Sequence, residues 1–193
     1  VKVGAQNCSS YERGAFTGEV STEMLKSLGI EYVIIGHSER REFFSEDNKT
    51  LYDKVKLSLA NNITPIFCCG EPLEVRNKGT HKDFVLSQLQ ETVYNLNSDG
   101  FSKVIIAYEP IWAIGSGMTA SVDDIQEMHS AIRSSIKTKY GSAISRNTSI
   151  LYGGSVKPIN AKDIFDLEDV NGGLIGGASL VANDFFDIVN SIS

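Results

Sequence analysis

The residues with the clearest chemistry are a histidine and a glutamate, each at the end of an apolar run. His37 ends the run Tyr-Val-Ile-Ile-Gly-His, and Glu109 ends the run Val-Ile-Ile-Ala-Tyr-Glu. Short continuous apolar runs that are rich in β-branched residues predict buried strands. Ligand sites of parallel sheets form at the carboxyl ends of the strands. An imidazole and a carboxylate at such ends could move protons together.

His37 stands where an expected strand passes into an expected helix that starts Ser-Glu-Arg-Arg. The amide groups at a helix start carry partial positive charge, which disfavours the charged imidazolium. A neutral imidazole could donate a hydrogen bond to a substrate carbonyl and shuttle a proton. The alternative is a buried histidine whose ring is satisfied by its protein neighbours.

Glu109 is followed directly by Pro110, which fixes the backbone beside the carboxylate. A carboxylate in a site that sheds water becomes a stronger base, because burial disfavours its charged form. A buried ion pair at the strand end is the competing interpretation, and we favour the catalytic one. The next segment, residues 111–120, is apolar yet contains glycines that could act as hinges.

Glycines end the last two expected strands, in Tyr-Gly-Gly-Ser at 152–155 and Ile-Gly-Gly at 175–177. Bare backbone amides at such positions can surround a phosphate, and Ser155 adds a hydroxyl group. Each glycine pair alone is weak support, since glycines are common in turns. The sequence lacks a G-x-x-x-x-G-K-[ST] motif, which argues against binding of a nucleoside triphosphate.

The residues that follow His37 are expected to support it. Ser38 starts the helix, and we expect Glu39 and Arg40 to be buried just behind the histidine. Arg41 is expected to be solvated at the helix start.

A second charged pair could serve the glutamate. Glu71 and Arg76 are predicted to form an ion pair that holds the loop after Glu109. His81 and His129 lie in expected helices with charged surroundings, and we assign them no role.

Strand and helix patterns alternate six times along the chain, without a linker or a low-complexity segment. The expected strands are Val1–Asn7, Tyr32–His37, Thr64–Cys69, Lys103–Glu109, Ser149–Gly153 and Gly173–Gly176. Apolar residues at helical spacing predict the helices; Ser21 caps the first, Ser121 with Asp124 forms a capping box, Asn160 begins another, and the last carries Phe185, Ile188, Val189 and Ile192.

This alternation predicts an α/β protein with a parallel sheet. A closed (β/α)8 barrel has eight units in ~250 residues, so six units correspond to a barrel that lacks its N-terminal part. A six-stranded open sheet is the alternative. In either case residues 1–193 form a single domain.

Composition narrows the function classes. The 193 residues are 41% apolar and 22% charged, as in ordinary globular proteins, and the net charge of −6 argues against a nucleic-acid partner. No apolar run approaches the ~20 residues of a membrane helix, so no membrane partner is expected. Three cysteines, an odd number with no C-x-x-C pattern, favour buried thiols in a reducing cytoplasm.

The chain resembles the triosephosphate isomerase family in seven segments that occur in family order. They are AQNC, GAFTGEVS, YVIIGHSERR, TPIFCCGE, AYEPIWAIGSG, ILYGGSV and GLIGGASL. The likeness extends from residue 5 to residue 180, and the motifs GHSERR and AYEPIWAIGSG are highly specific.

The resemblance implies a TIM (β/α)8 barrel that lacks the first two β/α units, with six parallel strands and the helices outside. It implies interconversion of dihydroxyacetone phosphate and glyceraldehyde 3-phosphate, in glycolysis and gluconeogenesis, with no cofactor and no metal. Glu109 would be the base and His37 the electrophile, the pairing of a carboxylate with a neutral histidine that this family uses. Backbone amides at Gly115, Gly176 and Gly177, together with Ser155, would hold the substrate phosphate.

The same resemblance implies a lid and a dimer. Residues 110–112 and 118–120 would be the hinges of the lid, and residues 113–117 its tip, closing over the phosphate to expel water. Residues 8–21 would insert into a second subunit, where Thr17 approaches the active site and Glu19 pairs with the partner's Arg40. A homodimer is therefore expected.

Two departures from the family pattern bear on activity. Nothing in the sequence matches the family's GNWKMN-like stretch, whose Asn and Lys contact the substrate; removing one such donor costs ~2.7–4 kcal/mol. Met118 stands where the family usually has a lysine. The alternatives are therefore a catalytically impaired fragment, inactive alone, or another sugar-phosphate barrel enzyme such as an epimerase.

Overall fold

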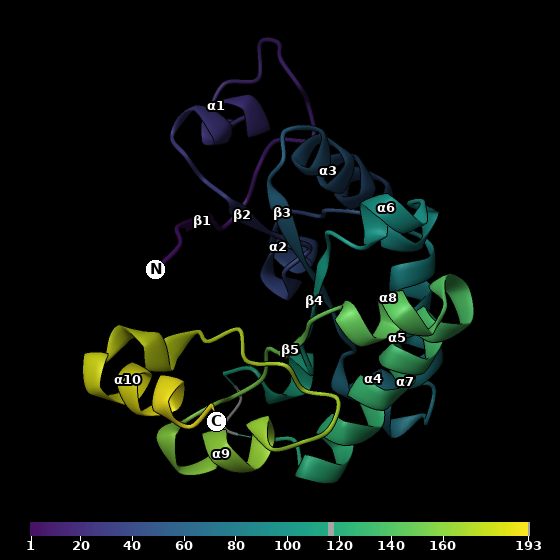
Figure 1. Ribbon diagram of the computed structural model, residues 1–193, viewed down its shortest axis with the longest axis vertical. Coiled ribbons are helices and arrows are strands. Elements are labelled where there is room, and N and C mark those ends of the chain that lie inside the picture. Colours follow the sequence, from purple (N-terminus) through teal and green to yellow (C-terminus); the bar gives the residue numbers. More distant parts are fainter. Residues whose placement is uncertain (116–117, 193) are drawn as a thin grey trace. The chain divides into compact units, whose positions relative to one another are not determined.

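The computed structural model describes residues 1–115 and 118–192, and strands and helices alternate along them (Figure 1). The strands are β1 (Gly4–Ala5), β2 (Tyr32–Ile35), β3 (Thr64–Cys69), β4 (Ile105–Tyr108) and β5 (Ile150–Tyr152). The helices are α1 (Thr22–Ser27), α2 (Ser38–Phe43), α3 (Asn48–Ala60), α4 (Leu73–Asn77), α5 (His81–Gln90), α6 (Ser98–Phe101), α7 (Val122–Tyr140), α8 (Ser142–Asn147), α9 (Pro158–Phe165) and α10 (Ala182–Asn190). Short 3-10 helices are η1 (Val93–Asn95), η2 (Ile111–Ala113) and η3 (Gly177–Leu180).

The strands of the described residues have the order β1-β2-β3-β4-β5, and the pairs β1–β2, β2–β3 and β4–β5 are parallel. The parallel α/β class predicted from the alternation of apolar runs is therefore confirmed. The chain divides into two compact units, Val1–Cys69 with Ser87–Ile105, and Gly70–Leu86 with Ile106–Ser193. Each unit has its own buried apolar core.

In the first unit, β2 pairs with both β1 and β3, and α3 packs on β2 and β3. Val33, Ile35 and Phe67 are fully buried, as expected for strands that are apolar on both faces. Gly36 follows β2 with φ of 82°, a left-handed conformation that glycine adopts at little cost. This bend directs the chain from β2 into α2, with His37 at the turn.

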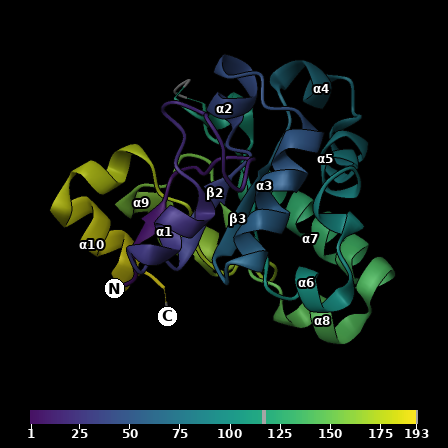
Figure 2. The ribbon, with the colours of Figure 1, turned by 90° about the horizontal axis from the view of Figure 1, so that it is seen from above.

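In the second unit, β4 pairs with β5, and Tyr108 and Tyr152 are register partners at the carboxyl end of the pair. The predicted capping box starts α7: the Ser121 hydroxyl accepts from the Asp124 amide, and the Asp124 carboxylate accepts from the Ser121 amide. Helix α7 packs on α8, α9 and β5. Helices α9 and α10 lie side by side in both views (Figures 1 and 2).

The expected strands are longer than the observed ones. The sixth, at Gly173–Gly176, is reduced to a single bridge between Tyr152 and Gly173, so the described residues contain five strands where six are predicted. Glycines offer no side chain to pack against a sheet and weaken a strand. The first expected strand shrinks to β1, beside which Val1 and Val3 are exposed.

Helix boundaries also differ by a few residues from the prediction. Helix α9 begins at Pro158, whose fixed φ suits the first helical position, and Asn160 lies in its first turn. There the Asn160 side chain accepts a hydrogen bond from the Lys157 amide at 2.7 Å. Ile192 lies beyond the end of α10, which closes at Asn190.

Among the described residues, none of the helices combines the length and the apolar character that crossing a membrane would require. All three cysteines, Cys8, Cys68 and Cys69, are buried and outside any disulfide in this part of the chain.

Candidate active site

Glu109 follows β4 directly and is buried, with 2% of its surface exposed. Two glycines make room for it. A Cβ atom on Gly70 would overlap the Glu109 carbonyl oxygen, and a Cβ on Gly153 would stand 2.9 Å from the Glu109 Cγ. The glutamate side chain therefore packs against bare backbone at the end of β5, beside the Tyr-Gly-Gly-Ser turn.

The predicted phosphate-binding positions of the second unit lie in turns and at a helix start. Ser155 follows β5 and is half-buried, and its carbonyl accepts from the Asn160 side chain at 3.2 Å. Gly176 and Gly177 open the 3-10 helix η3 and are exposed, with no atom within 4 Å of where a Cβ would stand. Gly115 is also exposed and has φ of 65°, which favours glycine.

The rest of the predicted lid is described in part. Residues 110–115 and 118–120 lie within the structure, whereas Gly117, one end of the predicted lid tip, lies outside the described residues.

His37 belongs to the first unit, where it is the N-cap of α2. Its Nδ1 accepts a hydrogen bond from the Glu39 amide at 3.3 Å. A ring nitrogen that accepts from a backbone amide carries no proton, so in the neutral ring the proton is on Nε2. The ring is therefore set to donate from Nε2, and about a third of the side chain, 29%, is exposed.

The expectation for the residues after His37 is corrected in two places. Glu39 is exposed rather than buried, and Arg41, expected to be solvated, donates to the Gly36 carbonyl at 2.9 Å and the Cys68 carbonyl at 3.1 Å. Helical spacing explains both: Ser38 and Arg41, three residues apart, share the inner face of α2, and Ser38 is buried.

Arg40 is half-buried. Its Nε donates a hydrogen bond to the Glu46 carboxylate at 2.6 Å, within the first unit. Lys54, itself buried, contacts the same carboxylate at 2.6 Å. Arg40 thus has an ion-pair partner in its own chain.

The loop at residues 8–21 is held by its own contacts. Tyr11 and Phe16 stack with ring centroids 3.9 Å apart, and a Cβ on Gly14 would stand 2.7 Å from the Phe16 ring. The loop and α1 line a cavity of about 440 Å³. Thr17 and Glu19 are exposed, so their predicted role at an interface stays a prediction.

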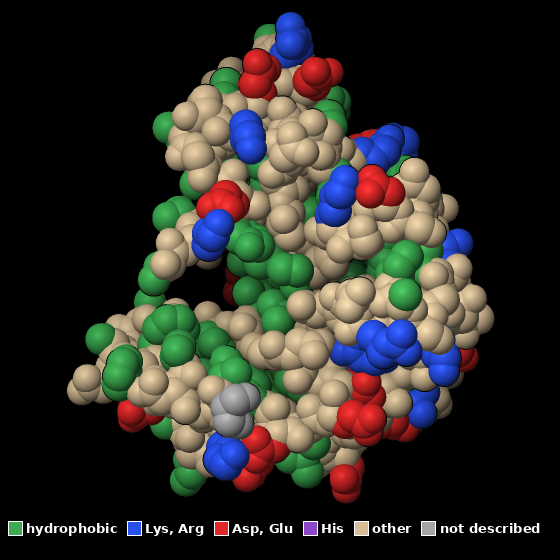
Figure 3. Space-filling model, in the orientation of Figure 1, with side chains coloured by type: hydrophobic (Ala, Val, Ile, Leu, Met, Phe, Trp, Pro, Cys, Tyr) green, Lys and Arg blue, Asp and Glu red, His purple; other side chains and the backbone are tan. Residues whose placement is uncertain are grey.

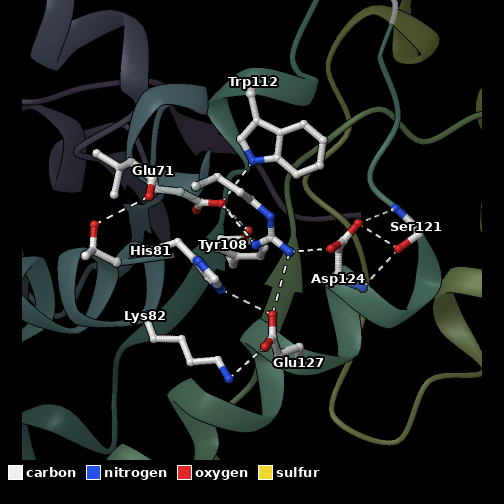
Figure 4. Close-up of polar contacts among 11 residues, drawn as sticks. Glu71, His81, Lys82, Tyr108, Trp112, Ser121, Asp124 and Glu127 are labelled. Atoms are coloured by element: carbon white, nitrogen blue, oxygen red, sulfur yellow. Dashed lines mark hydrogen bonds and ion pairs between the residues drawn. The ribbon is translucent and has the colours of Figure 1, made fainter. Parts of the chain in front are cut away.

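The predicted Glu71–Arg76 ion pair is confirmed, with an N–O distance of 3.3 Å (Figure 4). It holds the loop after Glu109 as expected. The Trp112 indole donates to the Glu71 carboxylate at 2.9 Å, and the Ile111 amide donates to the Glu71 carbonyl at 3.1 Å. The Tyr108 hydroxyl adds a third bond to this carboxylate at 3.1 Å.

The contacts that link the Glu71–Arg76 pair to α7 were not predicted from the sequence. Arg76 also contacts Asp124, and Glu127 contacts Lys82 at 2.7 Å and His81 at 3.2 Å. The signal in the sequence was the spacing of Asp124 and Glu127, which are three positions apart and so share one face of α7.

His129 lies in α7, in a helix as expected and near the charged Arg133 and Asp169; its full burial was not predicted. Its ring lies near Tyr108 and Tyr152, and Nδ1 is 3.3 Å from the Asp169 carbonyl oxygen. Burial, and to a smaller extent the charge of Arg133, lowers the pKa of His129 from 6.5 to about 4. The ring is therefore neutral at physiological pH and donates from Nδ1.

Within residues 1–115 and 118–192, no group of three His, Cys, Asp or Glu side chains could hold a metal ion.

The structure has parallel strands, intervening helices and a buried carboxylate beside glycine-rich turns at strand ends. It therefore belongs to the class of α/β proteins in which ligand sites form at the carboxyl ends of the strands. Comparison with known proteins identifies the family within this class. Residues 1–192 match the family described as triosephosphate isomerase, and the chain belongs to it.

Similar proteins carry the same name. A triosephosphate isomerase of Cytophaga hutchinsonii is 58% identical over 191 residues, which cover 99% of this chain and 76% of that protein. One from Bacteroides fragilis is 53% identical over 193 residues, 100% of this chain and 76% of that protein. One from Lactobacillus delbrueckii subsp. lactis is 50% identical over 188 residues, 97% of this chain and 75% of that protein.

Proposed function

We propose that this protein interconverts dihydroxyacetone phosphate and D-glyceraldehyde 3-phosphate without a cofactor or a metal. Family membership supports the reaction class and disfavours an epimerase. The observation that carries the proposal at the level of residues is Glu109, a carboxylate buried against the bare backbone of Gly153 at the end of a strand.

Glu109 removes a proton from the carbon next to the substrate carbonyl, giving an enediolate. His37 donates from Nε2 to the carbonyl oxygen and moves the proton between the two oxygens of the enediolate. The hydrogen bond from the Glu39 amide to Nδ1 supports this role, because it leaves Nε2 as the donor of a neutral ring. The mechanism requires His37 and Glu109 to face one substrate molecule.

The phosphate of the substrate is held by backbone amides at Gly115, Gly176 and Gly177 and by Ser155. The open space where side chains would stand at Gly176 and Gly177 supports this, since a phosphate can approach bare backbone closely. Ser38, Glu39 and Arg40 support the histidine, although Glu39 does so through its backbone amide rather than as a buried carboxylate.

Residues 110–120 form a lid that closes over the phosphate. Closure expels water, strengthens Glu109 as a base and protects the enediolate from losing its phosphate. The anchoring of Trp112 on Glu71 supports a fixed first hinge beside the base.

We further propose that the alternating elements belong to a (β/α)8 barrel and form a single domain; the parallel strands and intervening helices of the described residues support this. The protein works as a cytoplasmic homodimer with no nucleic-acid partner. Thr17 then approaches the partner's active site, and Glu19 pairs with the partner's Arg40.

The test is Glu109→Gln, which keeps the shape of the side chain and removes the base. Turnover of glyceraldehyde 3-phosphate should fall by roughly 10²–10⁴. Glu74→Gln, at an exposed position of α4, is the matched control and should keep full turnover. A loss of less than about tenfold for Glu109→Gln would remove the base assignment.

A further inference from the structure

Two turns of the second unit that carry proposed phosphate-binding residues are each held by a side chain a few residues further along. The Asn160 side chain donates to the Ser155 carbonyl at 3.2 Å, and the Ser179 hydroxyl donates to the Gly176 carbonyl at 2.7 Å. Asn160 lies in the first turn of α9, and Ser179 lies in η3. The two turns therefore share one arrangement, a side chain that binds a main-chain carbonyl.

At the second of these turns, the Gly176 carbonyl accepts two hydrogen bonds. One comes from the Ser179 hydroxyl at 2.7 Å and the other from the Ser179 amide at 2.9 Å. A trans peptide group is planar, so its N–H points away from its carbonyl oxygen. The carbonyl of Gly176 and the N–H of Gly177 belong to the same peptide group. Holding the carbonyl therefore sets the direction of the Gly177 amide, a proposed donor to the phosphate.

The glycines of this turn have little else to hold them. Both Gly176 and Gly177 are exposed, and no described atom lies within 4 Å of where their Cβ atoms would stand. Glycine has the widest backbone freedom of any residue, and ordering it on binding is correspondingly costly. The hydrogen bonds from Ser179 reduce this freedom without filling the space that a phosphate would need.

At the first turn, one side-chain amide joins two points of the backbone. The Asn160 Oδ1 accepts from the Lys157 amide at 2.7 Å, while its Nδ2 donates to the Ser155 carbonyl. Pro158 fixes the backbone where α9 begins. These contacts hold residues 155–157 in one conformation, and so they set the direction in which the Ser155 hydroxyl leaves the turn.

The other side of the same turn packs against a buried ring. A Cβ atom on Gly154 would overlap the Tyr152 hydroxyl, and Tyr152 itself is buried. The turn is thus confined by packing at Gly154 and by hydrogen bonds at Ser155. Of these contacts, only those made by Asn160 can be removed without changing the core.

We propose that Asn160 and Ser179 are positioning residues of the reaction, which aim the Ser155 hydroxyl and the Gly177 amide at the substrate phosphate. The inference rests on the proposed function, because the phosphate belongs to the triose phosphate. Donors that are already in place cost less to order when the ligand binds. Affinity for the phosphate group therefore depends on two side chains that act through the backbone.

The experiment removes each of these side-chain contacts. Asn160→Leu has a similar size and loses both hydrogen bonds, and it should lower kcat/KM for glyceraldehyde 3-phosphate by about 10- to 100-fold. Ser179→Ala loses only the hydroxyl, and it should lower kcat/KM by about 3- to 10-fold.

A substrate without a phosphate separates positioning from a structural role. D-Glyceraldehyde has the same reacting carbons, and its reaction can be followed by NMR as exchange of the hydrogen next to the carbonyl in heavy water. Its kcat/KM should stay within about twofold of wild type in both variants, because it has no phosphate to place. Equal losses for the two substrates would overturn the proposal and leave both residues with a structural role.

Matched controls are available for both variants. Ile159→Ala changes an exposed residue in the same turn of α9, where 90% of the side chain's residue surface is accessible. Ser102→Ala removes a serine hydroxyl that donates to the Asp99 carbonyl at 2.7 Å, the same kind of bond as that of Ser179. Both controls should keep the wild-type kcat/KM for glyceraldehyde 3-phosphate.

Binding of inorganic phosphate, followed by phosphorus NMR, gives a readout that needs no turnover. Its Kd should rise at least about threefold in Asn160→Leu and in Ser179→Ala, and stay unchanged in the controls. If the wild-type protein binds phosphate but shows no isomerase activity, the proposed function fails, while weaker binding by the variants still supports the inference.

Ser179→Ala keeps the inference testable if Asn160→Leu does not fold, since Ser179 is exposed. An unchanged Kd for phosphate in the folded variants would overturn the proposal. Failure of the wild-type protein to bind phosphate at all would overturn it as well.

Discussion

Gly153 stands beside the carboxylate of Glu109, and its missing side chain decides where that carboxylate lies. A Cβ there would meet the Glu109 Cγ at 2.9 Å and the Tyr108 carbonyl oxygen at 3.3 Å. Gly153 is not among the glycines with positive φ, so contact alone opposes a substitution at this position. The glycine therefore serves the site rather than a strained backbone.

Gly153→Ala should displace the Glu109 side chain while the fold survives. We expect kcat/KM to fall by about 10- to 100-fold, because a shift of about 1 Å in a reacting group has an effect of this size. Urea unfolding should show a loss of only about 1–3 kcal/mol, typical of overpacking. Activity within about twofold of wild type would show that Glu109 adapts to the added methyl group.

His129 should make the folded state sensitive to acid. Folding lowers the pKa of His129 from 6.5 to about 4. Below pH 6.5 the imidazole therefore binds a proton in the unfolded chain but stays neutral in the folded chain. The stability that comes from keeping His129 neutral is therefore fully present above the pKa of the unfolded chain, 6.5. It is lost as the pH falls toward the pKa of the folded chain, about 4. Between about pH 7 and about pH 5 the loss is about 2 kcal/mol.

His129→Asn keeps a donor near the Asp169 carbonyl but cannot titrate. Free energies of unfolding measured in urea at the two pH values should fall by about 2 kcal/mol less in the variant than in the wild type. Parallel losses in both proteins would show that His129 does not titrate during unfolding.

Individual residues were predicted well where a strong local rule applied. The Glu71–Arg76 pair joins opposite charges five residues apart, one just before α4 and one within it, and it is present. The predicted burial of Glu39 and the predicted exposure of Arg41 are both wrong, because the burial of each depends on which face of the short helix α2 packs inward. The burial of His129 depends on contacts with Tyr108 and Tyr152, on strands distant in the sequence, so it could not be predicted from local residues.

At the scale of elements, caps were the most reliable signals. Ser21 and Ser121 cap α1 and α7 as predicted, because each side chain accepts a hydrogen bond from an amide in the first turn. Strand length was overestimated, since apolar runs continue past the last ladder hydrogen bond. The Gly173–Gly176 segment shows the limit: its pairing depends on a neighbouring strand, and its glycines add little packing of their own.

Ser121→Ala should destabilise the start of α7. The alanine cannot accept from the Asp124 amide, and losses of this kind cost about 1 kcal/mol. The midpoint of urea unfolding should decrease accordingly. Ser142→Ala is the matched control, because Ser142 is an exposed first-turn residue of α8 whose side chain is not its cap. Equal shifts in the two variants would mean that the Ser121 cap contributes nothing beyond helix propensity.

At the scale of the whole chain, apolar side chains remain exposed on the second unit. The exposed side chains are Leu180 on η3, Val181 between η3 and α10, and Phe185 and Phe186 on α10. Figure 3 shows hydrophobic side chains gathered over α10 at the lower left. Contiguous apolar patches of this kind on a protein surface promote association. Such a patch cannot be predicted from composition, which is ordinary for a globular protein.

The 193-residue chain should therefore form assemblies larger than a dimer as its concentration rises, and Leu180→Gln with Phe186→Gln should reduce them. Both side chains are mostly exposed, at 87% and 65%, so the double variant should change the free energy of unfolding by less than about 1 kcal/mol. Sedimentation velocity over a range of concentrations measures the assemblies. Phe43→Gln with Phe44→Gln, two exposed positions on and just after α2, is the matched control. If both pairs reduce association equally, general surface hydrophobicity is responsible; if neither does, the surface of α10 is not what associates.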